Sequence, residues 1–178
     1  MLTVINGDIL YPKSDVLVCP CNLCGILNKN YSAKIVQSGG NLYKNIKKNI
    51  NNNNFKIGDC FITEAYQFKR RSVKRVYNII LSKYPNDFIQ IKNMTLCLDN
   101  VLKKALKNNI ESIAIPPLGI ENLEYNFIAI NMLKICKNYK KVMNIKIISD
   151  DPKFINVMEK YTIVEENNRI RKSEKNIK

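Results

Sequence analysis

Residues 112–119 carry the sequence SIAIPPLG, in which a short apolar, β-branched run meets two prolines. Apolar runs of about four to eight residues bounded by turn formers are typical of buried strands. Proline lacks the N–H that a strand interior donates, so Pro116 and Pro117 end the strand. An apolar stripe with helical spacing follows from Phe127 to Cys136. The segment therefore predicts a strand, a tight loop and then a helix.

The same alternation extends outward in both directions. Further strands are expected at residues 2–5, 16–19, 60–63, 73–81 and 145–149. One helix is expected over residues 93–108, with its apolar stripe at Leu96, Leu98, Val101, Leu102, Ala105 and Leu106. A shorter helix should follow Asp150, Asp151 and Pro152, and a Lys-rich helix should precede a surface loop at residues 51–54. Alternating strands and helices predict an α/β fold with a mixed sheet and helices on both faces.

The length of 178 residues suits one domain. We expect this domain to span residues 1–166. Residues 167–178 form a basic tail with Ile170 and Ile177 as its apolar side chains. This is too little apolar surface to offset the entropy of ordering, so we expect a disordered tail.

The chain is strongly basic, with 29 Lys and Arg against 15 Asp and Glu and a net charge of +14. Basic residues cluster at residues 44–48, 69–75 and 169–178. Such clusters release counterions when they meet phosphates, which suggests nucleic acid as a partner. A general preference for Lys, Asn and Ile, as in the run at residues 51–54, explains the charge equally well.

The residue types also exclude several classes of function. No apolar stretch approaches the roughly 20 residues needed to cross a bilayer, and Asn6 and Asp8 interrupt any leader, so we expect a cytoplasmic protein. The six cysteines should then be reduced thiols. We expect no metal at the cluster Cys19, Cys21 and Cys24, because a second ligand pair and histidine are both lacking. The absence of His also removes every Ser-His and Cys-His catalytic pair.

Four segments that flank the predicted strands together resemble the macrodomain family. They are the Gly-Asp-Ile at residues 7–9, the loop that reaches Asn22 and runs on to Ser32, the Gly-Asp before the strand at residues 60–63, and the Pro/Gly loop at residues 116–122. The resemblance covers about residues 1–161. It implies a three-layer α/β/α fold with a central mixed sheet and a site for ADP-ribose, with no cofactor.

The resemblance also implies roles for individual residues. Asp8 would accept a hydrogen bond from the adenine amine, the Ile9 N–H would donate to the adenine ring, and Asn22 would hold the distal ribose. Lys29 and the loop from Gly119 through Ile120, Glu121 and Asn122 would contact the phosphates. Asn28, Asn30 and Glu121 stand where the family has glycines. Asparagine tolerates left-handed conformations, whereas a carboxylate repels phosphate.

Residues 22–30 look most like the subgroup that removes ADP-ribose from DNA bases or carboxylate side chains. By resemblance to that subgroup, Lys83 of this chain would attack or stabilise the anomeric carbon of the distal ribose. Glu124, or else Glu121, would handle the proton. The leading hypothesis is an ADP-ribosyl hydrolase acting on nucleic acid or protein. A catalytically inert nucleotide-binding module is the alternative. A fold used only as a scaffold for a basic nucleic-acid-binding surface is a third possibility.

Overall fold

Six strands form one mixed sheet in the computed structural model, which describes residues 1–25 and 31–175, with side chains as far as residue 163. The strands are β1 (Leu2–Asn6), β2 (Val16–Asn22), β3 (Cys60–Glu64), β4 (Arg75–Ser82), β5 (Ser112–Ile115) and β6 (Asn144–Ser149). Their order is β1-β6-β5-β2-β4-β3. Every neighbouring pair is parallel except β3 with β4, which is antiparallel. All the strands expected from the sequence are therefore confirmed.

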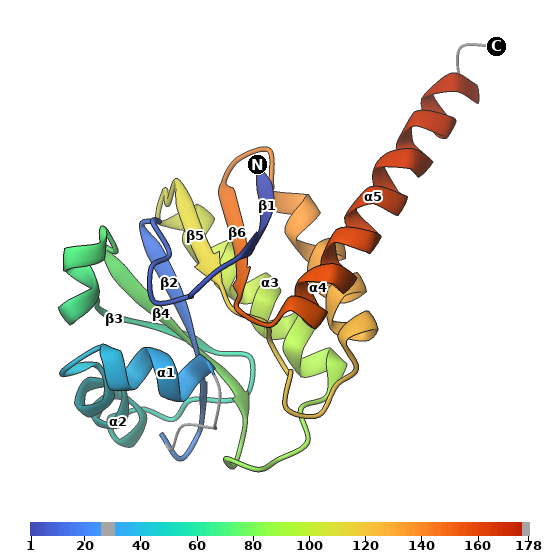
Figure 1. The fold of residues 1–178 in the computed structure, drawn as a ribbon. Helices are drawn as coiled ribbons and strands as arrows, with labels where there is room; N and C mark the ends of the chain where they lie inside the picture. Colours follow the sequence, from blue (N-terminus) through green and yellow to red (C-terminus); the bar gives the residue numbers. More distant parts are fainter. Residues whose placement is uncertain (26–30, 176–178) are drawn as a thin grey trace.

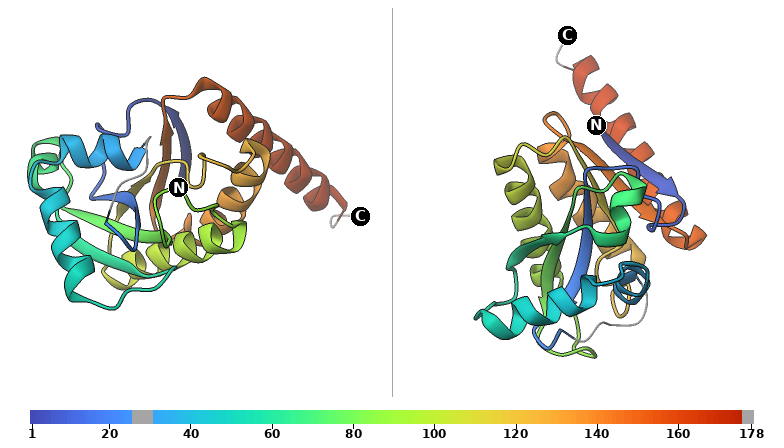
Figure 2. Two further views of the ribbon diagram at one scale, coloured as in Figure 1. Left: turned by 90° about the horizontal axis from the view of Figure 1, so that it is seen from below. Right: turned by 90° about the vertical axis from the view of Figure 1, so that its left-hand side faces the viewer.

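Helices cover both faces of this sheet, as Figures 1 and 2 show. Helices α1 (Tyr31–Ser38) and α2 (Leu42–Asn52) pack on one face, together with the short 3-10 helix η1 (Tyr66–Arg71). Helices α3 (Ile91–Lys107), α4 (Tyr125–Tyr139) and α5 (Pro152–Lys175) pack on the other. The predicted three-layer α/β/α architecture is confirmed.

The apolar stripe of α3 differs in detail from the predicted one. Leu98, Val101, Leu102 and Ala105 are buried as expected, and Met94 and Cys97 join them. Leu96 and Leu106 are exposed, because at helical spacing they point away from the centre of the face that these six residues form. In α4 the same geometry leaves Phe127 and Ile130 exposed.

Some elements were not foreseen or extend beyond their expected bounds. Helices α1 and η1, which are short, were not expected from the sequence. Helix α2 runs through Asn52 into the expected surface loop. The domain boundary expected at residue 166 falls inside α5, which continues as helix to Lys175. Within the described part of the chain, no helix is long and apolar enough to span a membrane.

Strand β3 forms one edge of the sheet, and side chains of neighbouring elements bind it at both ends. Lys104 Nζ, from α3, donates to the Cys60 carbonyl at 2.6 Å. At the other end Glu64 forms ion pairs with Lys69 at 2.8 Å and with Arg75 at 3.1 Å. These contacts fasten the edge strand to α3 and to η1.

The parallel pairing brings five strand ends together. The carboxyl ends of β1, β6, β5, β2 and β4 all lie at one edge of the sheet. The loops after these strands therefore meet there, and ligands bind at this edge in folds of this kind. Figure 1 shows this edge at the lower side of the molecule.

The packing of α3 predicts the effect of a core truncation. Leu98 is completely buried, so Leu98→Ala should lower the free energy of unfolding by about 2–5 kcal/mol. Leu106→Ala, on the exposed face of the same helix, should change it by no more than about 0.5 kcal/mol. Urea unfolding followed by circular dichroism measures both, and equal losses would contradict the assignment of the buried face.

Candidate functional site

The main cleft at the carboxyl edge has a volume of about 400 Å³. It is lined by Tyr31, Lys34, Ile120, Tyr125, Asp150 and Asp151. These residues come from α1, from the loop after β5, from the start of α4 and from the end of β6. A volume of this size lies in the range of small-molecule sites and accommodates a nucleoside.

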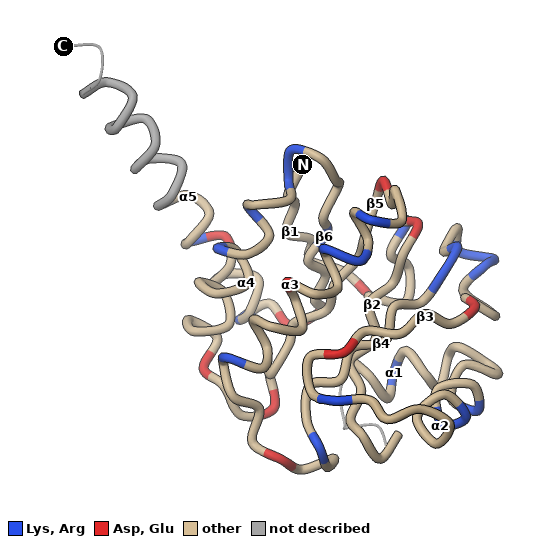
Figure 3. The backbone as a smooth tube through the Cα atoms, turned by 180° about the vertical axis from the view of Figure 1, so that it is seen from behind, with Lys and Arg blue, Asp and Glu red and all other residues tan. Residues whose placement is uncertain are grey.

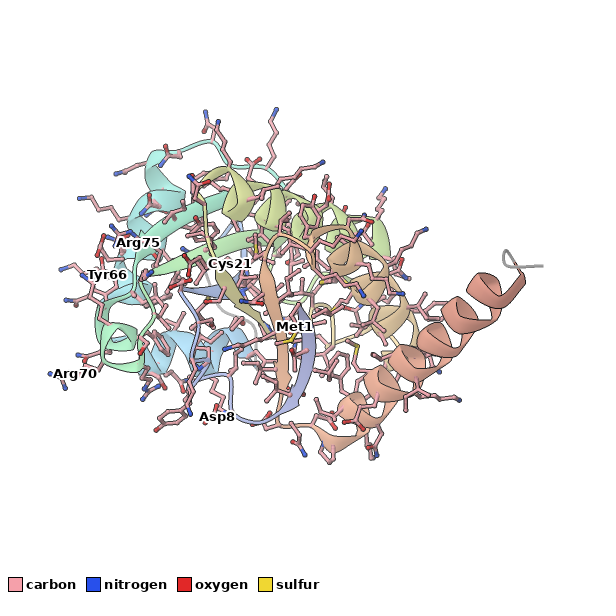
Figure 4. The ribbon with its side chains drawn as sticks, turned by 90° about the horizontal axis from the view of Figure 1, so that it is seen from above. Met1, Asp8, Cys21, Tyr66, Arg70 and Arg75 are labelled. Atoms are coloured by element: carbon pink, nitrogen blue, oxygen red, sulfur yellow. The ribbon has the colours of Figure 1, made fainter. Side chains whose placement is uncertain are left out.

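Lys34 ties two carboxylates together at this cleft. Its Nζ lies 3.0 Å from Asp8 Oδ1 and 2.6 Å from Asp150 Oδ2. Asp8 Oδ1 also accepts a hydrogen bond from the Leu10 N–H at 3.0 Å, so both contacts of Asp8 fall on the same oxygen. Figure 4 shows Asp8 on the loop after β1, beside α1. Asp8 Oδ2 has no hydrogen-bond partner among the described residues and remains available as an acceptor.

Hydrogen bonds set the protonation states of the cleft. The Lys34 ammonium lowers the pKa of Asp150. Burial works to lower the pKa of Lys34, but its hydrogen bonds to Asp150 and Asp8 raise it overall. Asp150 and Lys34 are therefore both charged at neutral pH.

Two tyrosine hydroxyls donate to the carboxylates of the cleft. Tyr31 lies 2.6 Å from Ser149 Oγ and donates to Asp150 Oδ1 at 3.2 Å, and Tyr125 donates to Asp151 Oδ2 at 2.5 Å. Burial raises the pKa of Tyr31 to about 12, and the hydrogen bond to Asp151 raises the pKa of Tyr125 to about 12. Both hydroxyls stay protonated, so they hold the carboxylates in place.

A second, much smaller cavity of about 10 Å³ lies farther along the same edge. It is lined by Pro20, Cys21, Asn22, Ser32, Leu81, Ile89 and Glu121. The predicted residues Asn22 and Glu121 meet here. Asn22 is buried, and its Oδ1 accepts a hydrogen bond from the Cys24 N–H at 3.0 Å. The space admits about one water molecule, so a larger group enters only if the surrounding loops move.

Backbone and amide hydrogen bonds join the loops around this cavity. Asn122 exchanges two hydrogen bonds of 3.1 Å with the backbone of Ile89. The Leu23 N–H donates to the Ser82 carbonyl at 3.1 Å. Gly119 has φ +82°, a conformation that side chains disfavour, and a Cβ there would lie 2.8 Å from Leu123. The amide of Asn122 is thus committed to holding two loops together, which differs from the ligand role expected for it.

The structure places the remaining predicted residues as follows. Ile120 lines the cleft, while the Ile9 side chain is fully buried in the core. Lys83 is exposed, with its Nζ 5.1 Å from the centre of the Tyr84 ring. Glu124 is exposed and is the N-cap residue of α4. In the described part of the chain, neither Lys83 nor Glu124 lines either cavity. Lys29, Asn28 and Asn30 lie outside the described residues.

Five cleft residues were missed by the sequence analysis as ligand candidates. Asp150 and Asp151 directly follow strand β6, at the edge where ligands bind in folds of this kind, and this position was a signal that could have found them. Tyr125 directly follows Glu124, which was a predicted site residue, so its position next to that residue was a signal. Tyr31 and Lys34 belong to α1, which was not predicted, and Lys34 has no local signal that separates it from the other lysines.

Two tyrosines form the aromatic side of the cleft. Strand β6 ends at Ser149, and the first aromatic residue after it is Phe154. Phe154 is fully buried and packs edge-on against Tyr125 at 5.7 Å, so it does not reach the cleft. Tyr31 and Tyr125 supply the aromatic lining instead.

The cysteines offer no nucleophile in the core. Burial raises the pKa of Cys60, Cys97 and Cys136 to about 12, so these thiols remain protonated. Among the described residues, no group of three Cys, His, Asp or Glu side chains could hold a metal ion.

The fold and the cleft together define a three-layer α/β/α protein with a nucleoside-sized site at the carboxyl edge of its sheet. The model of the Macro domain family matches residues 18–128, and the chain belongs to this family. This agrees with the resemblance that the loop sequences showed.

Individual relatives are distant in sequence. A DNA ADP-ribosyl glycohydrolase of Mycobacterium tuberculosis is 23% identical over 122 residues, which are 68% of this chain and 34% of that protein. The chain thus matches about a third of the length of its curated relatives. The macrodomain of Thermus aquaticus DarG superposes with a TM-score of 0.74 at 16% identity, covering 84% of this chain and 98% of that one. A Trypanosoma brucei macrodomain in complex with ADP-ribose gives 0.73 at 15% identity, covering 90% and 68%.

The ion pairs of Lys34 lead to a direct test. Lys34→Met removes the main cause of the low pKa of Asp150, so that pKa should rise toward its ordinary value. Carboxyl-detected NMR titration measures the change. Lys107→Met, near the C-terminus of α3, is the control and should leave Asp150 unaltered. An unchanged Asp150 in the Lys34 variant would show that the ion pair does not form in solution.

Proposed function

We propose that the chain binds ADP-ribose, with the adenine end in the main cleft, and hydrolyses it from a macromolecular carrier. The observation that carries this proposal is a nucleoside-sized cleft, at the carboxyl edge of a macrodomain sheet, whose lining residue Lys34 is paired with Asp8. The similar proteins support it, since one is a DNA ADP-ribosyl glycohydrolase and another is a macrodomain in complex with ADP-ribose.

The cleft offers what an adenine base requires. Asp8 Oδ2 can accept a hydrogen bond from the exocyclic amine, while Lys34 and Leu10 hold the other oxygen. Tyr31 and Tyr125 give the base aromatic surface to pack against. The Ile9 N–H is our candidate donor to a ring nitrogen.

The diphosphate and the distal ribose would extend from the cleft toward the small cavity. Gly119, Ile120 and Glu121 form the connecting loop, and Lys29 is our candidate for a phosphate contact. Asn22 lines the small cavity and would contact the ribose hydroxyls. Because this cavity holds about 10 Å³, ligand binding would move the loops that carry Glu121 and Ile89.

Hydrolysis would break the bond between the anomeric carbon of this ribose and the carrier, with water supplying the new hydroxyl group. Lys83 would stabilise or attack the anomeric carbon. Glu124 or Glu121 would take a proton from the water and pass it to the departing carrier. The carrier would be nucleic acid or protein. Six free cysteines suit the reducing cytoplasm, where we propose that the protein acts.

A catalytically inert ADP-ribose-binding module is the second candidate. It is favoured by the exposure of Lys83 and Glu124 and by their absence from the lining of both cavities in the described structure. Lys83 and Glu124 could therefore act on the anomeric carbon only after the loops around the small cavity have moved to admit the distal ribose.

A scaffold for one basic surface is less well supported. Figure 3 shows Lys and Arg spread over several elements. Within the cluster at residues 69–75, many charges have internal partners: Lys69 and Arg75 pair with Glu64, Lys74 pairs with Asp15, and Arg71 donates to the Leu10 carbonyl. Arg70 projects outward in Figure 4.

Calorimetric titration with ADP-ribose tests binding. The wild type should bind, and Asp8→Ala should weaken binding by about 1.5–3 kcal/mol, or about 10- to 150-fold, because a hydrogen bond to a charged group is lost. Glu111→Ala, an exposed carboxylate next to β5 at the far end of the strands, is the control and should bind as the wild type does. A wild type that binds no ADP-ribose would refute the proposal.

Hydrolysis is tested separately with an ADP-ribosylated oligonucleotide and an ADP-ribosylated peptide. Lys83→Ala should lower turnover by about 100-fold or more and leave the ADP-ribose affinity unchanged. Lys92→Ala, an exposed lysine in the first turn of α3, should retain turnover. Release of ADP-ribose is followed by chromatography. Binding without turnover in the wild type would identify the inert module.

A further inference from the structure

The loop between β4 and α3 exposes two aromatic side chains. Tyr84 is 50% exposed and Phe88 is 68% exposed. Single exposed apolar side chains are ordinary on a protein surface, whereas two largely exposed aromatic rings on one short loop can form part of a binding site. No part of the proposed ADP-ribose site uses either ring.

Hydrogen bonds fix the backbone that carries these rings. Asp87 Oδ2 accepts from the Lys83 N–H at 3.1 Å and from the Tyr84 N–H at 2.7 Å. Ser82 Oγ donates to the Tyr84 carbonyl at 2.9 Å. At the other end Ile89 is buried and is held on both sides by Asn122. The loop is therefore preorganised, which lowers the entropy lost when a partner binds.

The loop between β4 and α3 lies near the place that we assign to the distal ribose of the bound nucleotide. The main cleft lies where β1 and β6 end, and the small cavity includes the end of β2 and Leu81 of β4. The loop that carries Tyr84 and Phe88 begins directly after β4. Figure 1 shows it at the lower edge of the molecule, next to the loop after β2. With adenine in the main cleft, the distal ribose points toward this loop, and the carrier leaves the site over it.

The chemistry of the loop suits one kind of carrier. Aromatic faces stack on nucleobases, and a neighbouring lysine attracts phosphates. Lys83 Nζ lies 5.1 Å from the centre of the Tyr84 ring, and the whole chain carries a net charge of +14. A duplex keeps its bases stacked inside, so only unpaired bases can reach the rings.

We propose that Tyr84 and Phe88 form a stacking platform for unpaired bases of a single-stranded nucleic acid that carries the ADP-ribose. This inference rests on the proposed function, because the direction of the carrier follows from the placement of ADP-ribose. It specifies the carrier as nucleic acid and identifies the surface that holds it.

Fluorescence anisotropy with a labelled single-stranded DNA of ten nucleotides tests the platform. Tyr84→Ala combined with Phe88→Ala should weaken binding by about tenfold or more, since stacking on aromatic residues contributes that much per base. The slope of affinity against salt concentration should stay unchanged, because no phosphate contact is removed. Tyr84→Phe combined with Phe88→Trp keeps the aromatic faces and should restore wild-type affinity.

Two controls separate this inference from the proposed function. Calorimetry with free ADP-ribose should give equal affinities for the wild type and the double alanine variant, and a wild type without ADP-ribose binding would refute the proposed function alone. Leu106→Ala, an exposed apolar residue near the C-terminus of α3, should leave DNA affinity unaltered. Equal DNA binding by the wild type and the double alanine variant would overturn the platform. The platform would also be overturned if the double alanine variant lost turnover of an ADP-ribosylated peptide but kept turnover of an ADP-ribosylated oligonucleotide, because protein would then be the carrier.

Discussion

The parallel pairing of β1, β6, β5, β2 and β4 is the constraint on which the other features depend. Parallel strands need a crossover between them, so each strand end is followed by a loop and most loops lead into a helix. All five carboxyl ends consequently meet at one edge. Residues as distant in sequence as Asp8 and Asp150 lie within reach of a single lysine there. Neither the cleft nor the arrangement of loops beside it would exist in an antiparallel sheet of the same strands.

Lys34 resolves an electrostatic conflict within this arrangement. Asp8, Asp150 and Asp151 border a cleft to which we assign a ligand with two phosphates, and an uncompensated group of carboxylates would repel it. The ammonium group neutralises part of this charge and binds one oxygen of Asp8, so that the other can act as an acceptor. The tyrosine hydroxyls donate to Asp150 and Asp151 and fix the orientation of these carboxylates without changing their charge.

The sequence predicts the fold better than it predicts the site. Strands such as β5 are marked by local composition, and the loops at residues 7–9 and 116–122 have sequences specific enough to indicate the family. Asp8 was found because it belongs to the Gly-Asp-Ile segment that resembles the family. Lys34 could not be found, since its importance comes from ion pairs with distant residues, one of them 116 positions away, and one lysine among 29 basic residues has no distinguishing local pattern. The small cavity likewise depends on how five separate segments pack, namely β2, α1, β4 and the loops after β4 and β5.

The bonds that hold β3 also affect how molecules of this protein meet one another. An edge strand with free backbone groups is a template for a strand of another chain, and proteins limit this hazard with charged side chains at the edge. Lys104 donates to the carbonyl of the first residue of β3. Glu64, the last residue of β3, forms ion pairs with Lys69 and Arg75. Any incoming strand would have to displace these charged groups and strip them of water. The charged groups held at both ends of β3 therefore disfavour extension of the sheet by a strand of another molecule.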